Sequence, residues 1–365
     1  MRRTIELAAR GRGSTSPNPC VGAVLARGTA TLGEGFHRRK GEAHAEVEAI
    51  ESARRERNDV RGATLYASLE PCAHRGAVGP CTDAVLAAGI ARVVIGTPDP
   101  NAVAAGGAAR LRDAGIAVEI ADDPRAVLLI EDFAVATNAD RPYLRLKMAS
   151  SLDGYVAAAP GSSWLTGEEA REFVRELRAS YDAVMVGAGT VRVDDPQLTV
   201  RPPRSRQRPY VRVVACEEQP VPLDRRIFAD VDGYARTIVL APAGSREKFR
   251  ALEAIADVAY AGDDDAAQLD LRAALETLKE RGISSVLCEG GPTLAARLLE
   301  AGLVDRLDWI VAPIVLASDH ALPALARKAN LAASVAPFSF DTVERLGDDV
   351  LFSARISKGA ACSPA

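Results

Sequence analysis

The segment from Glu42 to Arg57 reads EAHAEVEAIESARRER, and its abundance of Ala and Glu predicts a helix. Short β-type runs flank this segment, at Val21–Ala26 before it and at Thr64–Ser68 after it. The same alternation of short apolar runs with amphipathic helical stretches continues along the chain. This pattern is typical of α/β domains with mostly parallel strands, and it differs from that of a sandwich or a helical bundle.

The other expected elements lie on either side of a break in the pattern at residues 138–142. Before the break we expect strands at Arg92–Gly96 and Val118–Ile120 and helices at Thr82–Ala88, Gly107–Ala114 and Asp123–Ala136. After it we expect strands at Tyr143–Met148, Ala183–Val186, Val211–Ala215, Thr237–Leu240, Ser285–Cys288, Leu307–Val311, Phe340–Arg345 and Val350–Ile356, and helices at Gly167–Arg178, Leu271–Arg281 and Thr293–Ala301. Because 365 residues exceed what one core usually supports, we expect two domains, 1–141 and 142–358, and a disordered tail at 359–365.

Composition narrows the class of protein. The formal charge of −4 gives no overall basic surface, which argues against broad nucleic-acid binding and favours a small-molecule substrate. Six dispersed cysteines predict reduced thiols rather than a disulfide framework. No apolar stretch reaches the ~18–20 residues of a membrane span, and the first residues lack a secretory apolar core. A cytoplasmic protein is therefore expected.

One constellation carries clear chemistry. His44-Ala45-Glu46 is followed by Pro71-Cys72 and then by Cys81, which together supply one imidazole and two thiolates. This ligand set makes a tetrahedral zinc site with one position left open for water, as catalysis requires. A later Pro-Cys and second Cys after H-x-E form the signature of zinc deaminases, in which the Glu relays protons. We therefore predict one zinc ion per chain, with Glu46 as the proton shuttle.

Spacing places this site at a helix start. Residues two apart do not share a helix face, so His44 and Glu46 can act together only around the first turn. Cys72 is expected to open a helix of its own, and residues 73–80 to form a loop beside the metal. The competing interpretation makes Cys72 and Cys81 small core residues. For Cys20, His37 and His320 we prefer core packing or ordinary surface positions to ligation.

The first half resembles the deaminase domain of the bifunctional deaminase–reductase family of riboflavin biosynthesis. The resemblance rests on the motifs Asn18–Val24 (NPCVGAV), His44–Val47 (HAEV), Leu69–His74 (LEPCAH) and Asp99–Asn101 (DPN). It implies a cytidine-deaminase-like three-layer α/β/α domain with Cys81 as the third ligand. By the same resemblance, Asn18 and His74 contact the pyrimidine.

The second half resembles the reductase domain of the same family, an α/β domain similar to dihydrofolate reductase that uses NADPH. The motifs are Lys147–Gly154 (KMASSLDG), Trp164–Thr166 (WLT), Asp194–Arg201 (DDPQLTVR) and Glu289–Leu294 (EGGPTL). The residues that the resemblance places at the cofactor are Ala149, Trp164, Thr190, Asp194, Gly291, Pro292, Thr293, Leu294, Ala295, Ala296 and Arg297. Those placed at the ribose phosphate are Ser162, Arg178, Leu198, Arg201 and Glu289, with Lys147 and Glu289 near the hydride acceptor.

The residues themselves allow a phosphate site at Glu289–Leu294. Gly290 and Gly291 end an apolar run and Pro292 stands where a helix begins, so free backbone N–H groups there can hold an anion. A plain tight turn is an equally good explanation of Gly-Gly alone. Arg178 and Arg201 can clamp a phosphate, although a lone Arg is more often a solvated side chain.

The chain departs from the family at three places. Ala77-Val78-Gly79-Pro80-Cys81 stands where the family usually has a basic residue and Thr-Pro-Pro-Cys. Cys216 replaces a common acidic residue, and 312–317 lacks the usual Lys and Gly. The resemblance still implies deamination of a diaminopyrimidinone ribosylamino phosphate followed by NADPH-dependent reduction of its ribosyl group, and we expect a homo-oligomer. A related enzyme acting on a similar pyrimidine in another pathway, a nucleoside or tRNA deaminase with an accessory domain, and a non-catalytic zinc module are the alternatives.

Overall fold

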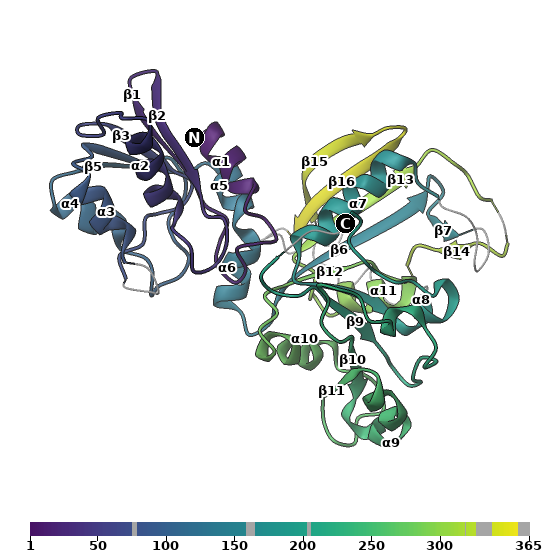
Figure 1. The fold of residues 1–365 in the computed structure, drawn as a ribbon. Coiled ribbons are helices and arrows are strands. Elements are labelled where there is room, and N and C mark those ends of the chain that lie inside the picture. Colours follow the sequence, from purple (N-terminus) through teal and green to yellow (C-terminus); the bar gives the residue numbers. More distant parts are fainter. Residues whose placement is uncertain (75–78, 158–164, 203–205, 318, 326–337, 357–365) are drawn as a thin grey trace, which may run out of the picture. The chain divides into compact units, whose positions relative to one another are not determined.

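The chain forms two compact units, Met1–Ala139 and Asp140–Ala365, in a computed structural model. The structure describes residues 1–74, 79–157, 165–202, 206–317, 319–325 and 338–356 (Figure 1). The tail expected at 359–365 lies outside these residues. None of the helices in the described ranges is long and apolar enough to cross a membrane.

The first unit is built on a mixed five-stranded sheet in the order β2-β1-β3-β4-β5. Its strands are β1 (Gly22–Arg27), β2 (Ala30–Phe36), β3 (Thr64–Ala67), β4 (Arg92–Ile95) and β5 (Ala117–Ile120). Its helices are α1 (Arg2–Ala9), α2 (Ala45–Arg55), α3 (Cys81–Ala87), α4 (Gly107–Asp113), α5 (Pro124–Leu129) and α6 (Glu131–Asn138). β1 pairs antiparallel with β2 and β3, whereas β3, β4 and β5 run parallel. The carboxyl ends of β3 and β4 therefore lie side by side, where ligand-binding loops gather.

Helix α2 packs so closely on β2 that only glycine fits beneath it. A Cβ on Gly33 would lie 2.4 Å from the carbonyl oxygen of Ala49, and a Cβ on Gly35 would lie 2.4 Å from the backbone nitrogen of Ala49. Both distances are far below van der Waals contact, so side chains at these positions would push the helix away. The close packing fixes the start of α2 against the sheet.

The expected helix at Asp123–Ala136 is wrong as a single element. It is two helices, α5 and α6, that break at Ile130, whose φ of −111° and ψ of 15° are not helical. Asp123 begins the first of them as its N-cap, and its side chain accepts a hydrogen bond from the Arg125 backbone N–H.

The second unit contains a nine-stranded sheet in the order β11-β10-β9-β8-β12-β6-β13-β16-β15. Its strands are β6 (Tyr143–Ser151), β8 (Ala183–Gly187), β9 (Val211–Ala215), β10 (Ile238–Pro242), β11 (Asp257–Ala261), β12 (Ser285–Cys288), β13 (Arg306–Ala312), β15 (Phe338–Leu346) and β16 (Asp349–Ile356). All pairs from β11 to β13 are parallel, and β16 and β15 are antiparallel. A separate two-stranded sheet joins β7 (Tyr155–Ala157) and β14 (Leu322–Pro323).

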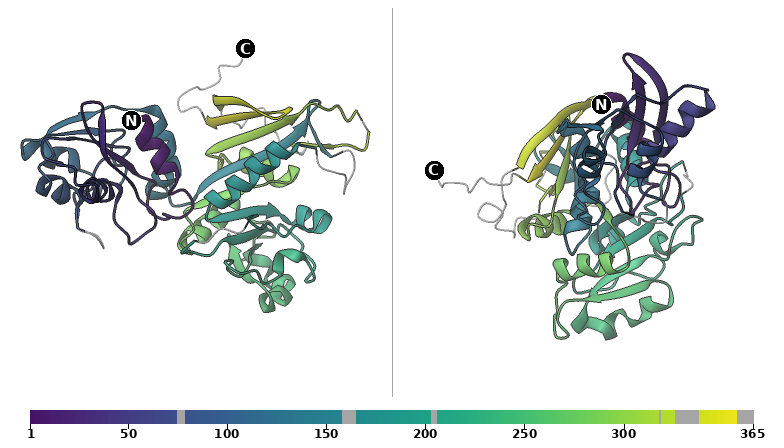
Figure 2. Two further views of the ribbon diagram at one scale, coloured as in Figure 1. Left: turned by 45° about the horizontal axis from the view of Figure 1, so that its top comes forward. Right: turned by 90° about the vertical axis from the view of Figure 1, so that its left-hand side faces the viewer.

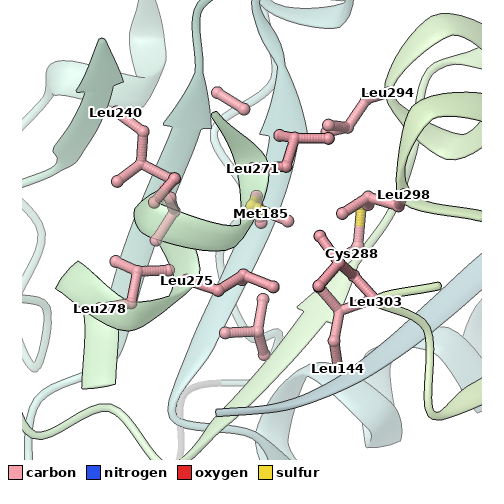
Figure 3. Close-up of a cluster of buried hydrophobic side chains, with 14 of the residues drawn as sticks. Leu144, Met185, Leu240, Leu271, Leu275, Leu278, Cys288, Leu294, Leu298 and Leu303 are labelled. Carbon is pink, nitrogen blue, oxygen red and sulfur yellow. The ribbon is translucent and has the colours of Figure 1, made fainter. Parts of the chain in front are cut away.

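Helices cover both faces of the parallel part of this sheet (Figures 1 and 2). They are α7 (Glu168–Ser180), α8 (Ala188–Asp194), α9 (Arg246–Phe249), α10 (Leu271–Glu280) and α11 (Pro292–Glu300), with short 3-10 turns at Arg226–Phe228, Ala243–Ser245 and Arg250–Ala254. Neighbouring strand residues alternate between two cores, so that Met185 packs with α10 and α11 whereas Val184 packs with α8 and α9. Figure 3 shows the first of these cores, where leucines of α10 and α11 meet Met185, Leu240 and Cys288. This two-sided burial holds the carboxyl ends of the strands rigid.

Candidate functional site

The three predicted zinc ligands come together in the first unit. The ligand atoms of His44, Cys72 and Cys81 all lie within 4.8 Å of one another, and they form a metal-type group among the described residues. His44 Nδ1 is 3.0 Å from Cys81 Sγ and 3.6 Å from Cys72 Sγ. One imidazole nitrogen and two thiol sulfurs that converge in this way fit zinc, which prefers nitrogen and sulfur donors in tetrahedral geometry.

Two helix starts and one extended segment supply the ligands. His44 is the N-cap of α2, with ψ of 163°, and Cys81 is the first residue of α3. The expectation that Cys72 opens a helix is wrong, because Cys72 lies in a non-helical segment after β3. That segment is held by its neighbours instead, since Thr82 donates to the Cys72 carbonyl and the Cys81 N–H donates to Cys72 Sγ at 3.3 Å.

The charges of the ligands suit a cation. A hydrogen bond from the Cys81 thiol, and a further one with His44, lower the pKa of Cys72 to about 4 against the effect of burial. The same hydrogen bond, reinforced by burial, raises the pKa of Cys81. Zinc binds cysteine as thiolate, so both sulfurs would be deprotonated with a metal ion bound between them.

Glu46 lies beside the ligands with one oxygen unused. Its side chain is 3% exposed, and Oε2 has no hydrogen-bond partner among the described residues. Burial raises the pKa of Glu46, although the nearby His44 opposes this effect. A buried carboxylate with a free oxygen next to a metal-type cluster is able to accept and return a proton.

The two predicted pyrimidine contacts reach the same region. Asn18 lies in a turn, where its N–H donates to the Thr15 carbonyl, and its Nδ2 is 3.2 Å from His37 Nε2. The His37 ring meets the His44 ring edge to face, with 5.1 Å between centroids. His74, two residues after Cys72, has a buried Nδ1 without a partner among the described atoms. Asn18 is therefore linked to the ligand region through His37, and His74 has an unused ring nitrogen two positions after Cys72.

Glu70 is a supporting residue that the sequence interpretation did not single out. Its Oε1 accepts hydrogen bonds from the backbone N–H groups of Gly106 and Ala108, at 3.2 and 2.8 Å. Its Oε2 accepts from the Asp99 N–H at 3.1 Å. One carboxylate thus ties the end of β3 to the loop after β4 and to the start of α4. Its position inside the LEPCAH motif was the available signal.

A second cluster lies at the carboxyl ends of the strands of the second unit. Glu289 follows β12, Lys147 lies on the adjacent parallel strand β6, and Arg178 lies on α7. Arg178 Nη2 donates to Glu289 Oε2 at 2.8 Å, and Arg178 Nε donates to Glu289 Oε1. Burial opposes the charge on Glu289, but Arg178 outweighs it and keeps the pKa of Glu289 below its ordinary value. Burial lowers the pKa of Lys147.

The residues predicted to hold the substrate phosphate lie partly together. Arg178 Nη1 donates to the Thr199 carbonyl at 3.3 Å, which joins α7 to the segment from Leu198 to Arg201. Leu198 has a φ of +52° and is buried. Arg201 Nε donates to Thr199 Oγ1 at 2.9 Å. Ser162 lies outside the described residues.

The predicted cofactor residues form a backbone cradle. Gly290 and Gly291 have φ of +78° and +99°, and Gly291 is the N-cap of α11. A Cβ on Gly291 would lie 2.9 Å from Thr190 Oγ1, which places Thr190 against the turn. Positive-φ glycines that lead into a nine-residue helix suit a phosphate group of a dinucleotide, because first-turn N–H groups lack intrahelical partners.

The other predicted cofactor residues are placed differently. Leu294, Ala295 and Ala296 are buried, so their side chains belong to the core, and Leu294 appears there in Figure 3. Arg297 donates to Glu217 Oε1 at 2.6 Å and to the Leu269 carbonyl. The remaining ones are Ala149 on β6, Pro292 and Thr293 in the first turn of α11, and Asp194 at the end of α8. Burial raises the pKa of Asp194. Trp164 lies outside the described residues.

Comparison with known proteins matches both units. The profile described as "Cytidine and deoxycytidylate deaminase zinc-binding region" matches residues 1–97, and that described as "RibD C-terminal domain" matches residues 142–352. The chain is 38% identical to the riboflavin biosynthesis protein RibD of Escherichia coli (strain K12), over 96% of both chains. It is also 38% identical to RibD of Aquifex aeolicus, over 87% of this chain and 86% of that protein.

Solved structures agree with these relatives. RibD of Acinetobacter baumannii (form 1) is 35% identical with a TM-score of 0.80, and 98% of each chain is covered. A diaminohydroxyphosphoribosylaminopyrimidine deaminase/5-amino-6-(5-phosphoribosylamino)uracil reductase of Thermotoga maritima is 36% identical with a TM-score of 0.84, covering 98% of this chain and 97% of that one. The expected fold class, a deaminase domain followed by a reductase domain, is confirmed.

Proposed function

Since the chain belongs to the RibD family of bifunctional riboflavin biosynthesis enzymes, we propose that each unit carries one of two consecutive reactions. The first unit is a zinc deaminase that hydrolyses the ring amino group of a diaminopyrimidinone ribosylamino phosphate. The second is a reductase that converts the ribosyl group of the product to ribityl with NADPH. The convergence of His44, Cys72 and Cys81 beside the buried Glu46 is the observation that carries the proposal.

In the deaminase reaction, His44, Cys72 and Cys81 would hold the zinc ion. Bound zinc supplies Lewis-acid activation of a water molecule. Glu46 would move a proton from the attacking water to the leaving amino group through Oε2, because its carboxyl group is already desolvated and has an oxygen without a partner among the described residues. Asn18 and His74 orient the pyrimidine ring by hydrogen bonds, which hold the reacting carbon in line with the attacking water.

In the reductase reaction, conversion of ribosyl to ribityl adds a hydride at the anomeric carbon and a proton at the ring oxygen, while the bond between that carbon and that oxygen breaks. NADPH would supply the hydride, and the turn at Gly290 and Gly291 would hold a phosphate of the cofactor. Lys147 gives up the proton readily because burial lowers its pKa. Glu289 stays ionised through its pair with Arg178 and balances the charge of Lys147.

The decisive experiment is a product assay on the purified full chain with the diaminopyrimidinone substrate, with and without NADPH. We expect ammonia release in both cases and NADPH oxidation only after deamination. Glu46→Gln should keep its zinc and lose deamination, whereas Glu48→Gln on the same helix should retain both. Release of ammonia by Glu46→Gln at the wild-type rate would exclude Glu46 as the proton shuttle. Activity with another pyrimidine alone would favour a different pathway.

We also propose that the protein is a cytoplasmic homo-oligomer. The five cysteines of the described ranges are free thiols, which suits a reducing compartment. Among the described residues, strand β15 ends the nine-stranded sheet and exposes Phe340 and Val343, and an edge strand with apolar side chains favours pairing with a second copy. Light scattering should show a mass above that of one chain, and Val343→Lys should reduce this mass. Val193 is exposed on α8, away from the strand edge, so Val193→Lys is the control and should leave the mass unchanged. A monomer at micromolar concentration contradicts this proposal.

A further inference from the structure

His37 joins the backbone beside the metal ligands to the side-chain amide of Asn18. Its Nδ1 is 3.1 Å from the carbonyl oxygen of Ala43, the residue before His44, and its Nε2 is 3.2 Å from Asn18 Nδ2. The His37 side chain is buried, and its backbone N–H donates to the Val21 carbonyl at 2.9 Å. The ring is therefore held at both of its nitrogens, and the backbone of His37 is held by Val21.

These contacts decide which atoms carry hydrogen. A carbonyl oxygen only accepts, so the Nδ1 of His37 must donate to Ala43. In the neutral ring Nε2 is then an acceptor, and the group that faces it must be the NH₂ of Asn18. Because the amide is planar, its oxygen Oδ1 is turned away from His37. The hydrogen-bond network thus assigns the orientation of the amide.

We propose that His37 is a positioning residue that fixes the Asn18 amide, so that the deaminase site selects a pyrimidine with an N–H donor facing Oδ1. The inference rests on the proposed function, in which Asn18 contacts the substrate. With the amide reversed, the NH₂ group would face the N–H of the substrate and leave two donors opposed. A site that positions a hydrogen-bonding group correctly rejects ligands that lack its partner far better than an apolar site does.

Two isosteric variants separate the two arms of His37. Asparagine places its amide nitrogen near the position of Nδ1, so His37→Asn keeps the bond to Ala43 and loses the acceptor for Asn18. Glutamine places its amide near the position of Nε2, so His37→Gln keeps an acceptor for Asn18. Asn18→Ala removes the substrate contact itself. Zinc content and NADPH oxidation with the deaminated pyrimidine show whether each variant is intact.

Asn18→Ala should lower the deaminase kcat/KM about tenfold, the effect of one lost hydrogen bond. His37→Asn should cause a similar loss, with no further loss when it is combined with Asn18→Ala, because His37 acts through Asn18. His37→Gln should stay within about threefold of the wild type. Equal losses in the two His37 variants, or losses that multiply in the double variant, would overturn the proposal.

Nitrogen-15 NMR of the wild-type protein provides a test that needs no substrate. The chain has four histidines, so the His37 signals can be assigned by their loss in His37→Gln. We expect the neutral ring with hydrogen on Nδ1. Hydrogen on Nε2, or on both nitrogens, would overturn the inference even if Asn18 proves essential. Full activity of Asn18→Ala would instead remove Asn18 from the substrate site and leave zinc-dependent deamination by Glu46 standing.

Discussion

Gly107 begins α4 and packs on the backbone of Pro71, which directly precedes Cys72, one of the three predicted zinc ligands. A Cβ on Gly107 would lie 1.7 Å from the Pro71 carbonyl oxygen. Real Cβ atoms do not approach closer than 3.0 Å, so in Gly107→Ala this oxygen must move by about 1.3 Å. Cys72 moves with it because the two residues share a peptide bond. A misplacement of about 1 Å can cost 10²-fold in rate, so we expect the deaminase kcat/KM to fall about hundredfold.

The neighbouring Gly106 provides the matched control. Its φ is +95°, but no atom lies within 4 Å of the position of its Cβ. Gly106→Ala therefore costs about 1–2 kcal/mol of backbone strain and leaves Pro71 in place. Ammonia release and zinc content should stay near wild type in Gly106→Ala and fall in Gly107→Ala, while both oxidise NADPH with the deaminated pyrimidine normally. A Gly107→Ala protein with full zinc and wild-type deamination would refute the reasoning.

Three further predictions concern the metal ligands and the charges of the second unit. Cys81→Ser should abolish zinc retention, because the hydroxyl is a poor zinc ligand. Metal analysis that finds one zinc ion per chain in this variant would contradict the predicted ligand set. Arg178→Met should destabilise the second unit by about 3 kcal/mol at pH 7, since it leaves Glu289 buried without its main partner. Because Arg178 lowers the pKa of Glu289, the ion pair of the two residues stabilises the folded state above the ordinary pKa of 4.5. This stabilisation is lost as the pH falls through the lower pKa that Glu289 has in the folded state. The difference in unfolding free energy between wild type and Arg178→Met should therefore shrink below about pH 4.5. Urea unfolding monitored by the fluorescence of the two tryptophans, both of which belong to the second unit, measures this difference. A difference that does not change with pH would count against the ion pair as its origin. Asp308→Asn should lower the unfolding free energy by about 3–5 kcal/mol, because Asp308 is fully buried and accepts hydrogen bonds from Arg145 and Ser353. Glu172→Gln, which removes an exposed ion pair, should lower it by less than about 1 kcal/mol. Equal losses in the two variants would refute this distinction between buried and exposed pairs.

The sequence predicted most of the strands and helices that surround the sites, but it missed β2. This strand carries Gly33 and Gly35, which weaken β propensity, and sequence patterns interpret such glycines as turns. They are required because α2 packs directly on the strand, a tertiary contact that no local pattern reveals. The break between α5 and α6 was missed for the opposite reason, since no glycine or proline marks Ile130.

The candidate sites also contain some residues that the sequence predicted and others that only the fold brings together. Ligand types and spacing were enough to predict that His44, Cys72 and Cys81 come together, because zinc chemistry restricts which residues can serve. The ion pair of Arg178 with Glu289 joins residues 111 positions apart, so only the fold brings them together. The role inferred for His37 depends on which ring nitrogen faces the Ala43 carbonyl and which faces the Asn18 amide, and no sequence pattern encodes that geometry.

The order of strands in the second sheet has a consequence for synthesis on the ribosome. β6 lies between β12 and β13, yet β12 begins at Ser285, 134 residues after β6 ends at Ser151. At about 5–20 residues per second, the nascent β6 waits roughly 7–27 seconds for either neighbour. The last strand of the first sheet ends at Ile120, so the amino-terminal unit can fold and take up its metal during this interval. An apolar strand with two unpaired edges is meanwhile exposed, and we expect chaperones to engage the growing chain at that stage.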